Sequence, residues 1–353
     1  MLKCNVAVSG LNATDDPAPG IAFARSLRES GEWEGRIIGL AYDASDTGIY
    51  NGSFFDEVYL MPDPLLPAAF YDRLKKVHLK SRMNVIVPLL DYELLSLPAL
   101  ELYLREMGIN MLIPSAPSLR QHLKTRLTSF CRQNNIKSPR QVQLVDPQNI
   151  AGAIEDLGLP AVVKGVIHGS CTAYSYSEAL IHFNRIRERW GLPILVQEYI
   201  AGDEYNTDCL IDRDRKTIGA VQMKKLAVTE KGKCWAGVTV YDKELMDLSL
   251  DITARLGWIG PIELEFVRQR STGDYYLLEI NPRFGTWIYL SSRAGQNLPL
   301  TAVRIAMGER VKPFASYQTG IMFMRYSLDM VSPISVMAQV VNTGELITNE
   351  QEG

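Results

Sequence analysis

Short apolar runs and longer amphipathic segments alternate through the first 115 residues. The short runs predict strands and the amphipathic segments predict helices, because side chains alternate across a strand but recur every three to four residues on a helix. The predicted strands are Asn5–Ser9, Arg36–Tyr42, Asn84–Pro88 and Asn110–Pro114, and the predicted helices are Ala18–Ser30, Pro67–Leu79 and Pro98–Gly108. Strands that alternate with helices of this length predict an α/β domain with a doubly wound parallel sheet.

The pattern changes near Ser115–Ser118, and a smaller α+β region follows. Its predicted helices are Leu119–Asn134, 149–157 and Ser177–Trp190, and its predicted strands are 141–145 and 161–165. From Ile194 strands dominate up to a hairpin near residue 280, and a last helix is predicted at Leu298–Met307. The tail is left unassigned, and its last six residues are expected to fray. A chain of 353 residues is long enough for two or three such units.

The hairpin carries the most informative side chains of the sequence. Two strand-like runs, IELEFVRQ and DYYLLEINPRF, are joined by the turn-rich segment 270–274, which contains Gly273. If five residues form the turn, position 269 faces 275, and Glu265 then lies directly opposite Glu279. Period-two alternation places Glu263 and Asn281 on the same face as these two acids.

Carboxylates that face each other destabilise a strand pair, so a positive group is expected between them. Two carboxylates and an amide oxygen are hard ligands, and Mg²⁺ is held by a few such groups together with substrate phosphates. The face therefore predicts a metal–nucleotide site at Glu265, Glu279 and Asn281. The alternative is a solvated hairpin edge with scattered acids.

The bulk properties exclude several classes of function. A net charge of −3 gives no basic footprint for nucleic acid or an anionic membrane. No apolar run approaches the roughly 18 residues of a membrane span, and the N-terminus lacks the layout of a signal peptide. Five scattered cysteines and four dispersed histidines favour reduced thiols and no transition-metal site. We therefore expect a cytoplasmic protein that acts on small molecules.

Two further segments have the residue types that bind a nucleotide. Lys164 ends an apolar strand before the loop Gly165–Thr172, where Gly169 and Ser170 offer backbone N–H groups to phosphate. The alternative is a strand-end lysine that extends to solvent. In the second segment, main-chain groups of Glu198–Ile200 are placed to pair with an adenine edge and Glu204 with ribose hydroxyls; here the alternative is a hairpin with exposed acids.

A nicotinamide site near the N-terminus is disfavoured. The turn after Val6–Gly10 does not have the G-x-G-x-x-G spacing, and the loop that contains Asp43 is too long and polar for that fingerprint.

The chain resembles the ATP-grasp superfamily, in particular the branch of carbamoyl-phosphate synthetase large subunits and related carboxylate–amine ligases. Four segments carry the resemblance in the order of that family: VPLLDYELLSLPALELYLREMGINMLIPSAPSLRQHLKTR, AVVKG, VQEYIAGDEYNTDCL and LLEINPRFGTWIYLSSRAGQNLP. The resemblance implies a Rossmann-like domain at 1–115, an N-terminal ATP-grasp lobe with a phosphate lid at 116–195, and a C-terminal lobe at 196–353.

The resemblance also implies roles for individual residues. The implied nucleotide-binding residues are Lys124, Lys164, Gly169, Ser170, Glu198, Tyr199, Ile200, Glu204 and Lys225, and at the terminal phosphate Lys224 and Lys225 are alternatives. The implied metal ligands are again Glu265, Glu279 and Asn281, and the implied catalytic residues are Arg283 and Lys164. The loop after Lys164 is poorer in glycine than is usual in the family, which leaves the contacts of the lid open. Asp91, Glu93 and Arg293 are candidates for substrate contacts or for solvated surface groups.

The implied activity is ATP- and Mg²⁺-dependent ligation, with Mn²⁺ as an alternative metal. A carboxylate is converted to an acyl phosphate, ADP is released, and an amine attacks to give an amide or peptide bond. The alternatives are a carbamoyl-phosphate-synthetase-like or carboxylase-like enzyme that phosphorylates bicarbonate or carbamate, and a non-catalytic ATP-binding protein. The expected partners are a small carboxylate and a small amine, without nucleic acid or membrane, and a homodimer is compatible with the resemblance.

Overall fold

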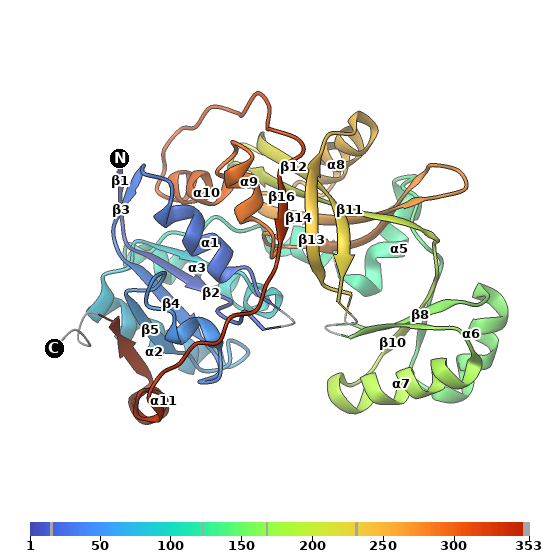
Figure 1. The fold of residues 1–353 in the computed structure, drawn as a ribbon, viewed down its shortest axis with the longest axis horizontal. Coiled ribbons are helices and arrows are strands. Elements are labelled where there is room, and N and C mark those ends of the chain that lie inside the picture. The colour runs from blue at the N-terminus through green and yellow to red at the C-terminus, as the bar shows by residue number, and fades with distance from the viewer. Residues whose placement is uncertain (15–16, 122, 167–168, 230–231, 349–353) are drawn as a thin grey trace.

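The N-terminal domain is built on a five-stranded sheet in a computed structural model that describes residues 1–14, 17–121, 123–166, 169–229 and 232–348 (Figure 1). The strand order is β17-β5-β4-β2-β6. The strands are β2 (Val6–Ser9), β4 (Ile37–Ala41), β5 (Glu57–Leu60), β6 (Val85–Val87) and β17 (Glu345–Ile347). β2, β4, β5 and β6 pair in parallel, whereas β17 is antiparallel to β5. The predicted doubly wound parallel sheet is confirmed, although β5 was not predicted.

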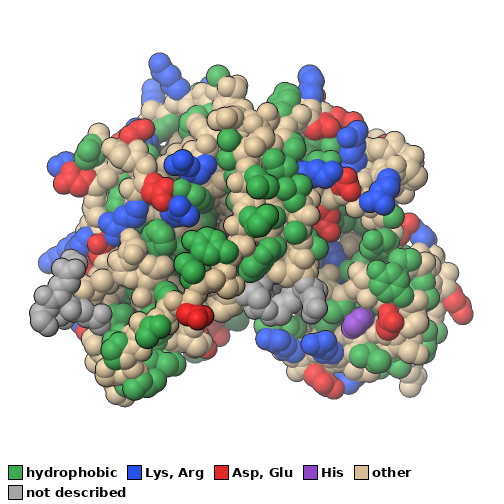
Figure 2. Space-filling view, viewed as in Figure 1, with side chains coloured by type: hydrophobic (Ala, Val, Ile, Leu, Met, Phe, Trp, Pro, Cys, Tyr) green, Lys and Arg blue, Asp and Glu red, His purple; other side chains and the backbone are tan. Residues whose placement is uncertain are grey.

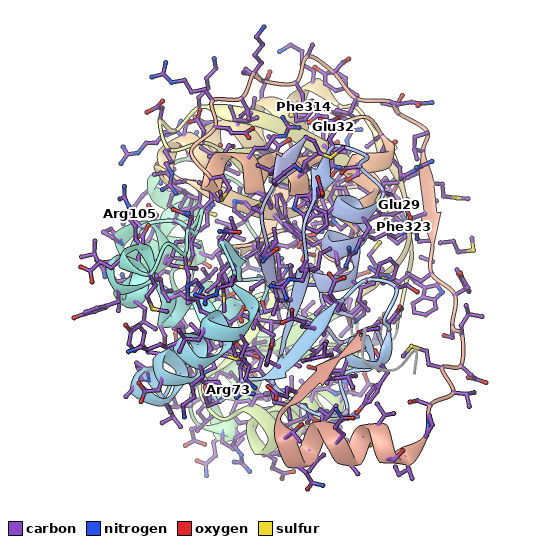
Figure 3. The ribbon with its side chains drawn as sticks, turned by 90° about the vertical axis from the view of Figure 1, so that its left-hand side faces the viewer. Glu29, Glu32, Arg73, Arg105, Phe314 and Phe323 are labelled. Carbon is purple, nitrogen blue, oxygen red and sulfur yellow. The ribbon has the colours of Figure 1, made fainter. Side chains whose placement is uncertain are left out.

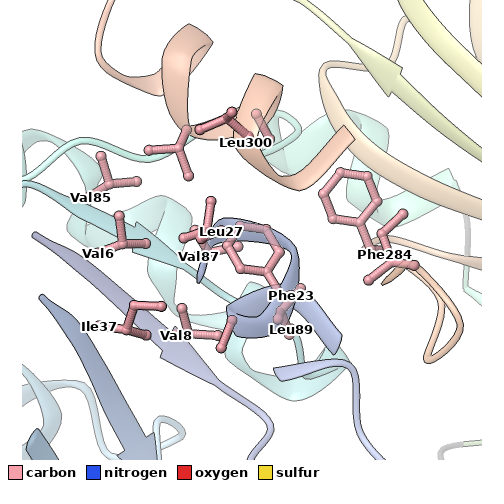
Figure 4. Packing of buried hydrophobic residues seen from close by; sticks show 14 of the residues in the cluster. Val6, Val8, Phe23, Leu27, Ile37, Val85, Val87, Leu89, Phe284 and Leu300 are labelled. Atoms are coloured by element: carbon pink, nitrogen blue, oxygen red, sulfur yellow. The ribbon is translucent and has the colours of Figure 1, made fainter. Parts of the chain in front are cut away.

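The helices of this domain are α1 (Gly20–Arg28), α2 (Pro67–Ser81) and α3 (Leu97–Glu106). A small parallel pair, β1 (Leu2–Lys3) with β3 (Trp33–Glu34), extends one end of the domain. Asn110, which was predicted to begin a strand, makes only an isolated bridge to Val85. Figure 4 shows Phe23 and Leu27 of α1 near the valines of β2 and β6, with Phe284 and Leu300 from much later in the chain beside them.

The prediction of one continuous helix at Leu119–Asn134 is wrong. The structure has two helices, α4 (Ala116–Gln121) and α5 (Lys124–Gln133), and Leu123 between them has an extended ψ of 134°. The break starts a new helix at Lys124, so this lysine stands at a helix N-terminus instead of inside a helix.

The next part of the chain forms a small lobe with its own core. Its sheet has the order β7-β10-β8-β9, with strands β7 (Gln141–Leu144), β8 (Ala161–Gly165), β9 (Ser170–Ala173) and β10 (Ile194–Glu198). Helices α6 (Ile150–Leu157) and α7 (Tyr176–Trp190) cover the sheet, and apolar side chains such as Val163, Phe183 and Val196 fill the space between them (Figure 1). The strands and helices predicted here agree with these elements, except that β9 lies where a loop was expected.

A six-stranded antiparallel sheet with the order β15-β14-β11-β12-β13-β16 forms the rest of the molecule. The strands are β11 (Gly202–Ile211), β12 (Thr217–Val228), β13 (Cys234–Val240), β14 (Gly260–Gln269), β15 (Tyr275–Asn281) and β16 (Met322–Met324). Three helices accompany it: α8 (Lys243–Arg255), α9 (Tyr289–Arg293) and α10 (Leu298–Ala306). α8 was not predicted, since the sequence analysis expected strands throughout this region. α10 agrees with the predicted helix.

The predicted hairpin forms, but by a different route. The turn pairs Arg268 with Tyr275, not 269 with 275, so the predicted turn is one residue off. A β-bulge then shifts the register between Glu265 and Phe266, and Glu265 faces Glu279 as predicted. The bulge reverses the face on which side chains of β15 point. Tyr275, Leu277 and Ile280 consequently enter the core, and Glu279 and Asn281 face the other side.

The C-terminal segment runs back to the N-terminal domain. After β16 the chain crosses the molecule in extended form to α11 (Ile334–Thr343) and β17, which completes the first sheet (Figure 1). β17 thus lies in the N-terminal sheet, whereas the predicted boundaries place 196–353 in one lobe. Thr348, expected to fray, bonds through its N–H to the Asp56 carbonyl and through Oγ1 to that of Phe55, and 349–353 lie outside the described residues.

The predicted fold class, a Rossmann-like domain followed by a two-lobed α+β part, is confirmed. Across the described ranges, every helix is too short or too polar to cross a lipid bilayer.

Candidate functional site

The candidate site lies on one face of the six-stranded sheet. Asn281 donates a hydrogen bond from Nδ2 to Glu263 at 3.0 Å and another to Glu265 at 2.9 Å. Glu279 pairs directly with Glu265 across the two strands. The four polar side chains that alternation placed on one face are therefore brought together by the hairpin and its bulge.

Two lysines from distant elements neutralise the facing acids. Lys124, at the start of α5, lies 3.0 Å from Glu279 Oε1. Lys225 on β12 lies 3.0 Å from Glu265 and 2.7 Å from Glu204. Burial disfavours the charged form of Glu265, but the Lys225 ammonium outweighs it and lowers the pKa of this carboxyl to about 2. The positive groups expected between the facing acids are these two ammonium groups.

The structure separates Lys224 from Lys225. Lys224 turns to the other face of β12 and pairs with Asp203 at 2.6 Å. The Lys225 side chain is 7% exposed, and although burial opposes its charge, Glu265 and Glu204 raise its pKa. Only Lys225 belongs to the site.

Arg283 follows β15 and lies between the two large parts of the molecule. Its Nε is 2.8 Å from Asp91 Oδ1 in the N-terminal domain, and its Nη1 is 3.6 Å from Glu263. Burial opposes its charge, but Asp91 and Glu263 raise its pKa. Asp91 therefore holds Arg283, whereas Glu93 is buried and bonded to Ser9 and Tyr42. Glu93 is therefore neither a substrate contact nor a solvated surface group, so both predicted alternatives are wrong for this residue.

Lys164 is a buried cation of a different kind. It lies on β8 opposite Ser170 of β9 and makes no ion pair with any residue that the structure describes. Burial lowers its pKa, the nearby Lys124 cation lowers it further, and the more distant carboxylates of Glu279 and Glu265 only partly offset these effects. Burying a cation without an ion-pair partner costs free energy of folding. An anionic ligand next to Lys164 would offset this cost.

The remaining predicted residues surround this centre. Glu204 joins it through Lys225, whereas Gly169 and Ser170 are exposed on the edge of the small lobe. Since β9 begins at Ser170, the expected loop Gly165–Thr172 is shorter than predicted, and His168 lies outside the described residues. Glu198 accepts from the Arg140 N–H, and Tyr199 and Ile200 form the connection between the lobes.

Sequence reasoning missed a buried polar layer beneath the site. Glu263, predicted only to share the face, accepts hydrogen bonds from Asn206 Nδ2, Trp287 Nε1 and Asn281 Nδ2 at 2.7 to 3.0 Å. Asp208 accepts from the Gly285 N–H, and its other oxygen has no hydrogen-bond partner among the described residues. Burial, together with Glu263, raises the pKa of Asp208. The alternating acids and amides of Glu204, Asn206 and Asp208 are the signal that could have revealed this layer.

The donor set fits a hard divalent cation. Glu265 and Glu279 supply carboxylates, and Asn281, which is hydrogen-bonded to Glu265, supplies an amide. No cluster of three or more His, Cys, Asp or Glu side chains suited to a metal occurs in the described parts of the chain. Mg²⁺ prefers six oxygen ligands, so phosphate and water would have to complete its shell here.

A family model matches residues 192–326, which include β11 to β16 and most of the candidate site. Its description is "ATP-grasp in the biosynthetic pathway with Ter operon".

Curated relatives match about half of the chain. The carbamoyl phosphate synthase large chain of Clostridium perfringens is 25% identical over 181 residues, which are 47% of this chain and 16% of the relative. The N-terminal section of the same enzyme from Methanopyrus kandleri is 27% identical over 182 residues, which are 47% of this chain and 32% of the relative. The chain thus spans less than a third of the length of either relative.

Solved structures match almost the whole chain. The biotin carboxylase domain of Hydrogenobacter thermophilus 2-oxoglutarate carboxylase, in complex with MgADP, ADP and bicarbonate, superposes with a TM-score of 0.64. It is 17% identical, and the match covers 89% of this chain and 71% of that one. N5-carboxyaminoimidazole synthetase from Staphylococcus aureus with ADP has a TM-score of 0.62 at 15% identity, with 87% and 78% covered.

Proposed function

We propose that this chain, whose resemblance to the ATP-grasp superfamily is confirmed, is an ATP-dependent carboxylate–amine ligase that works through an acyl phosphate. The observation that carries the proposal is the meeting of four partly buried cations with two facing carboxylates. Lys124, Lys164, Lys225 and Arg283 come from four different elements and converge on Glu265 and Glu279. A structural ion-pair network alone would not leave Lys164 without an ion-pair partner among the described residues.

In the proposed complex, ATP lies between the small lobe and the six-stranded sheet. Its adenine contacts the main chain at Glu198–Ile200, Glu204 binds the ribose, and Lys124, Lys164 and Lys225 bind the phosphates. The exposed residues Gly169 and Ser170 would cover the phosphate tail. This arrangement matches the phosphate charge to the cation that the protein itself leaves unpaired.

Mg²⁺, or Mn²⁺, would be held by Glu265, Glu279 and Asn281 and would neutralise charge on the phosphates. In the structure, Lys124 forms an ion pair with Glu279 and Lys225 forms one with Glu265. We therefore expect both ammonium groups to turn toward phosphate oxygens when the nucleotide binds.

The chemistry requires charge stabilisation and the exclusion of water. A carboxylate oxygen attacks the γ-phosphorus, ADP leaves, and the amine then attacks the acyl carbon with loss of phosphate. Arg283 is fixed by Asp91 and Glu263 beside Glu279, where it would stabilise the negative charge that develops on the transferred group. No nucleophilic side chain is needed.

A second candidate is favoured by the solved structures. The biotin carboxylase domain of the Hydrogenobacter enzyme is in complex with bicarbonate, and four of the similar structures are N5-carboxyaminoimidazole or N5-carboxyaminoimidazole ribonucleotide synthetases. In this alternative, bicarbonate or carbamate is the carboxylate that becomes phosphorylated. The same side chains would serve, because both substrates present a carboxylate-type oxygen to the γ-phosphate.

The two candidates differ in what triggers ADP release. We would measure ADP and phosphate from Mg-ATP with amino acids, small carboxylates and bicarbonate, each alone and in pairs with amines. The ligase predicts release only with a carboxylate–amine pair, together with a product mass equal to their condensation. Release with bicarbonate alone would support the second candidate.

The variant Glu279→Gln tests the metal site in the same assay. It keeps the shape of the side chain but removes the metal-facing charge, so ADP release should disappear while the far-UV spectrum stays unchanged. Retention of most of the wild-type rate would overturn the metal site. Absence of ADP release with every substrate, while MgADP still binds, would reject both reactions for these substrates and leave a nucleotide-binding protein.

A further inference from the structure

Arg325 is a cation that neither the sequence analysis nor the proposed function uses. It follows β16, the edge strand of the six-stranded sheet. Its Nε donates to the Cys234 carbonyl at 3.1 Å, and its Nη2 donates to the Thr286 carbonyl and hydroxyl, both at 2.9 Å. All of these acceptors are neutral.

The register of the sheet places Arg325 on the face of the candidate site. Lys225, Gly237 and Phe323 form one row of paired positions across β12, β13 and β16. Paired residues share a face, and positions two apart on one strand share it too. Phe323 and Arg325 therefore face the same side as Lys225, and the Arg325 guanidinium lies 5.5 Å from the Phe323 ring centre. Figure 3 shows Phe323 on β16 at the side of the molecule where Glu29 of α1 lies.

The loop after Arg283 connects this arginine to the reaction centre. Thr286, which Arg325 binds, is three residues from Arg283, and between them Gly285 bonds to Asp208 on β11. The Cys234 thiol lies close enough to Lys225, Arg325, Glu263 and Glu265 for their charges to affect it. Arg325 is therefore one wall of the same site.

A comparison of charges separates Arg325 from the other cations. Lys124, Lys225 and Arg283 each face a carboxylate, whereas Arg325 has no acidic partner within the described ranges. Lys164 is also unpaired, and the proposed function assigns it to phosphate. Nη1 of Arg325 keeps two N–H groups without a hydrogen bond to any described residue. A partly buried guanidinium whose Nη1 N–H groups have no hydrogen bond to a described residue suits a carboxylate-type anion.

We propose that Arg325 binds the carboxylate group of the substrate and selects anionic substrates for this site. The proposal rests on the proposed function for the location of the phosphate groups. The shared chemistry is a carboxylate-type anion, and an organic acid and bicarbonate are its two sources. The competing explanation is structural: Arg325 only ties β16 to the loop at Thr286.

The first test needs no turnover. Wild-type protein with MgADP is treated with phenylglyoxal, and the modification rates of Arg325 and Arg73 are followed by peptide mass spectrometry. Acetate, bicarbonate and chloride are compared at equal ionic strength. We expect acetate or bicarbonate to slow labelling of Arg325 at least about threefold more than chloride does, as expected for a bound anion. The anion that protects Arg325 from labelling shows whether an organic acid or bicarbonate is the source of the bound carboxylate. Equal effects of acetate, bicarbonate and chloride would overturn the proposal.

Arg73 is a matched control. Like Arg325, it uses Nε and Nη2 to tie a C-terminal segment to a sheet, through the carbonyls of Leu60 and Gly344 (Figure 3). Its labelling should not respond to acetate or bicarbonate.

The second test uses variants and whichever carboxylate or bicarbonate supports ADP release. Arg325→Gln should raise the KM for that anion by about 10- to 100-fold, the range for losing a charged hydrogen bond. The KM for ATP should stay within about twofold, and Arg325→Lys should recover part of the loss. Arg73→Gln, the matched structural variant, should lower only the melting temperature. If Arg325→Gln changes both KM values and the melting temperature together, the role of Arg325 is structural and the proposal is overturned. If no carboxylate or bicarbonate supports ADP release, the proposed function fails. The labelling test still decides whether Arg325 binds an anion.

Discussion

At the scale of single residues, two buried lysines of one site have opposite effects on stability. Lys164 has no ion-pair partner in the described chain, whereas Lys225 binds Glu204 and Glu265. The folded protein holds the Lys164 proton less tightly than the unfolded chain does, so the charged form costs stability at pH values below its folded pKa. Lys225 contributes in the opposite direction, since removing it leaves two carboxylates without their cation.

We therefore predict that Lys164→Met raises the melting temperature of the nucleotide-free protein and weakens MgADP binding about 10- to 100-fold. Lys225→Met should also weaken binding, but it should lower stability by about 2 kcal/mol or more. Thermal unfolding and calorimetric titration at pH 7 measure both effects. Unchanged MgADP affinity in Lys164→Met would contradict its phosphate role, and equal destabilisation by both variants would contradict the difference in pairing.

At the scale of elements, the small lobe has a hydrophobic core that is separate from the other two. Its long helix α7 is capped by Ser175, whose side chain accepts from the Glu178 N–H, while the Glu178 side chain accepts from the Tyr174 N–H. This reciprocal cap contributes about 1 kcal/mol in typical helices. Loss of the cap should therefore affect only the lobe.

Ser175→Ala is predicted to speed amide hydrogen exchange in β8, β10 and α7 and to leave β2, β4 and β14 unchanged. Asp242→Ala is the matched variant, because Asp242 caps α8 by accepting from the Leu245 N–H in a different core. It should affect the six-stranded sheet and spare the lobe. Faster exchange throughout the protein in either variant would show that the cores unfold together.

At the scale of the whole molecule, the C-terminal segment holds the two large sheets together. β16 pairs with β13 at one edge, and β17 pairs with β5 at the other. Val340 and Leu346 are buried, Lys80 pairs with Glu345 at 2.7 Å, and the Arg73 side chain donates to the Gly344 carbonyl. On β16 and directly after it, apolar side chains such as Met322, Met324 and Tyr326 remain exposed, and Figure 2 shows apolar groups gathered on the middle of one face of the molecule.

Truncation after Val331 should therefore lower the free energy of unfolding by at least about 2 kcal/mol, the value of one fully buried leucine. It should also expose the edge of β5, which promotes edge-to-edge association. Thermal unfolding and light scattering would detect both effects. The matched variant is Glu345→Gln, which removes one partly exposed ion pair and should cost less than about 1 kcal/mol. A truncated protein with wild-type stability and no association would show that β17 is dispensable.

Local rules let the sequence determine much of this protein. The order of strands and helices in the first domain follows from periodicity, and the facing pair Glu265 and Glu279 follows from a hairpin with a turn of known residue types. The β-bulge could not be predicted this way. It forms because Tyr275, Leu277 and Ile280 all enter the core, which requires one change of face within β15.

Only the tertiary structure decided which partner each charged side chain contacts. Lys124 meets Glu279, Asp91 meets Arg283, and Arg325 meets Thr286, in each case across different elements of the fold. The tertiary structure also shows that Lys164 has no ion-pair partner among the described residues, which the sequence does not reveal. A sequence lists the charged groups and the strand faces on which they lie. The packing of sheets and helices determines their separation and burial, and the strength of an electrostatic interaction depends on those two quantities.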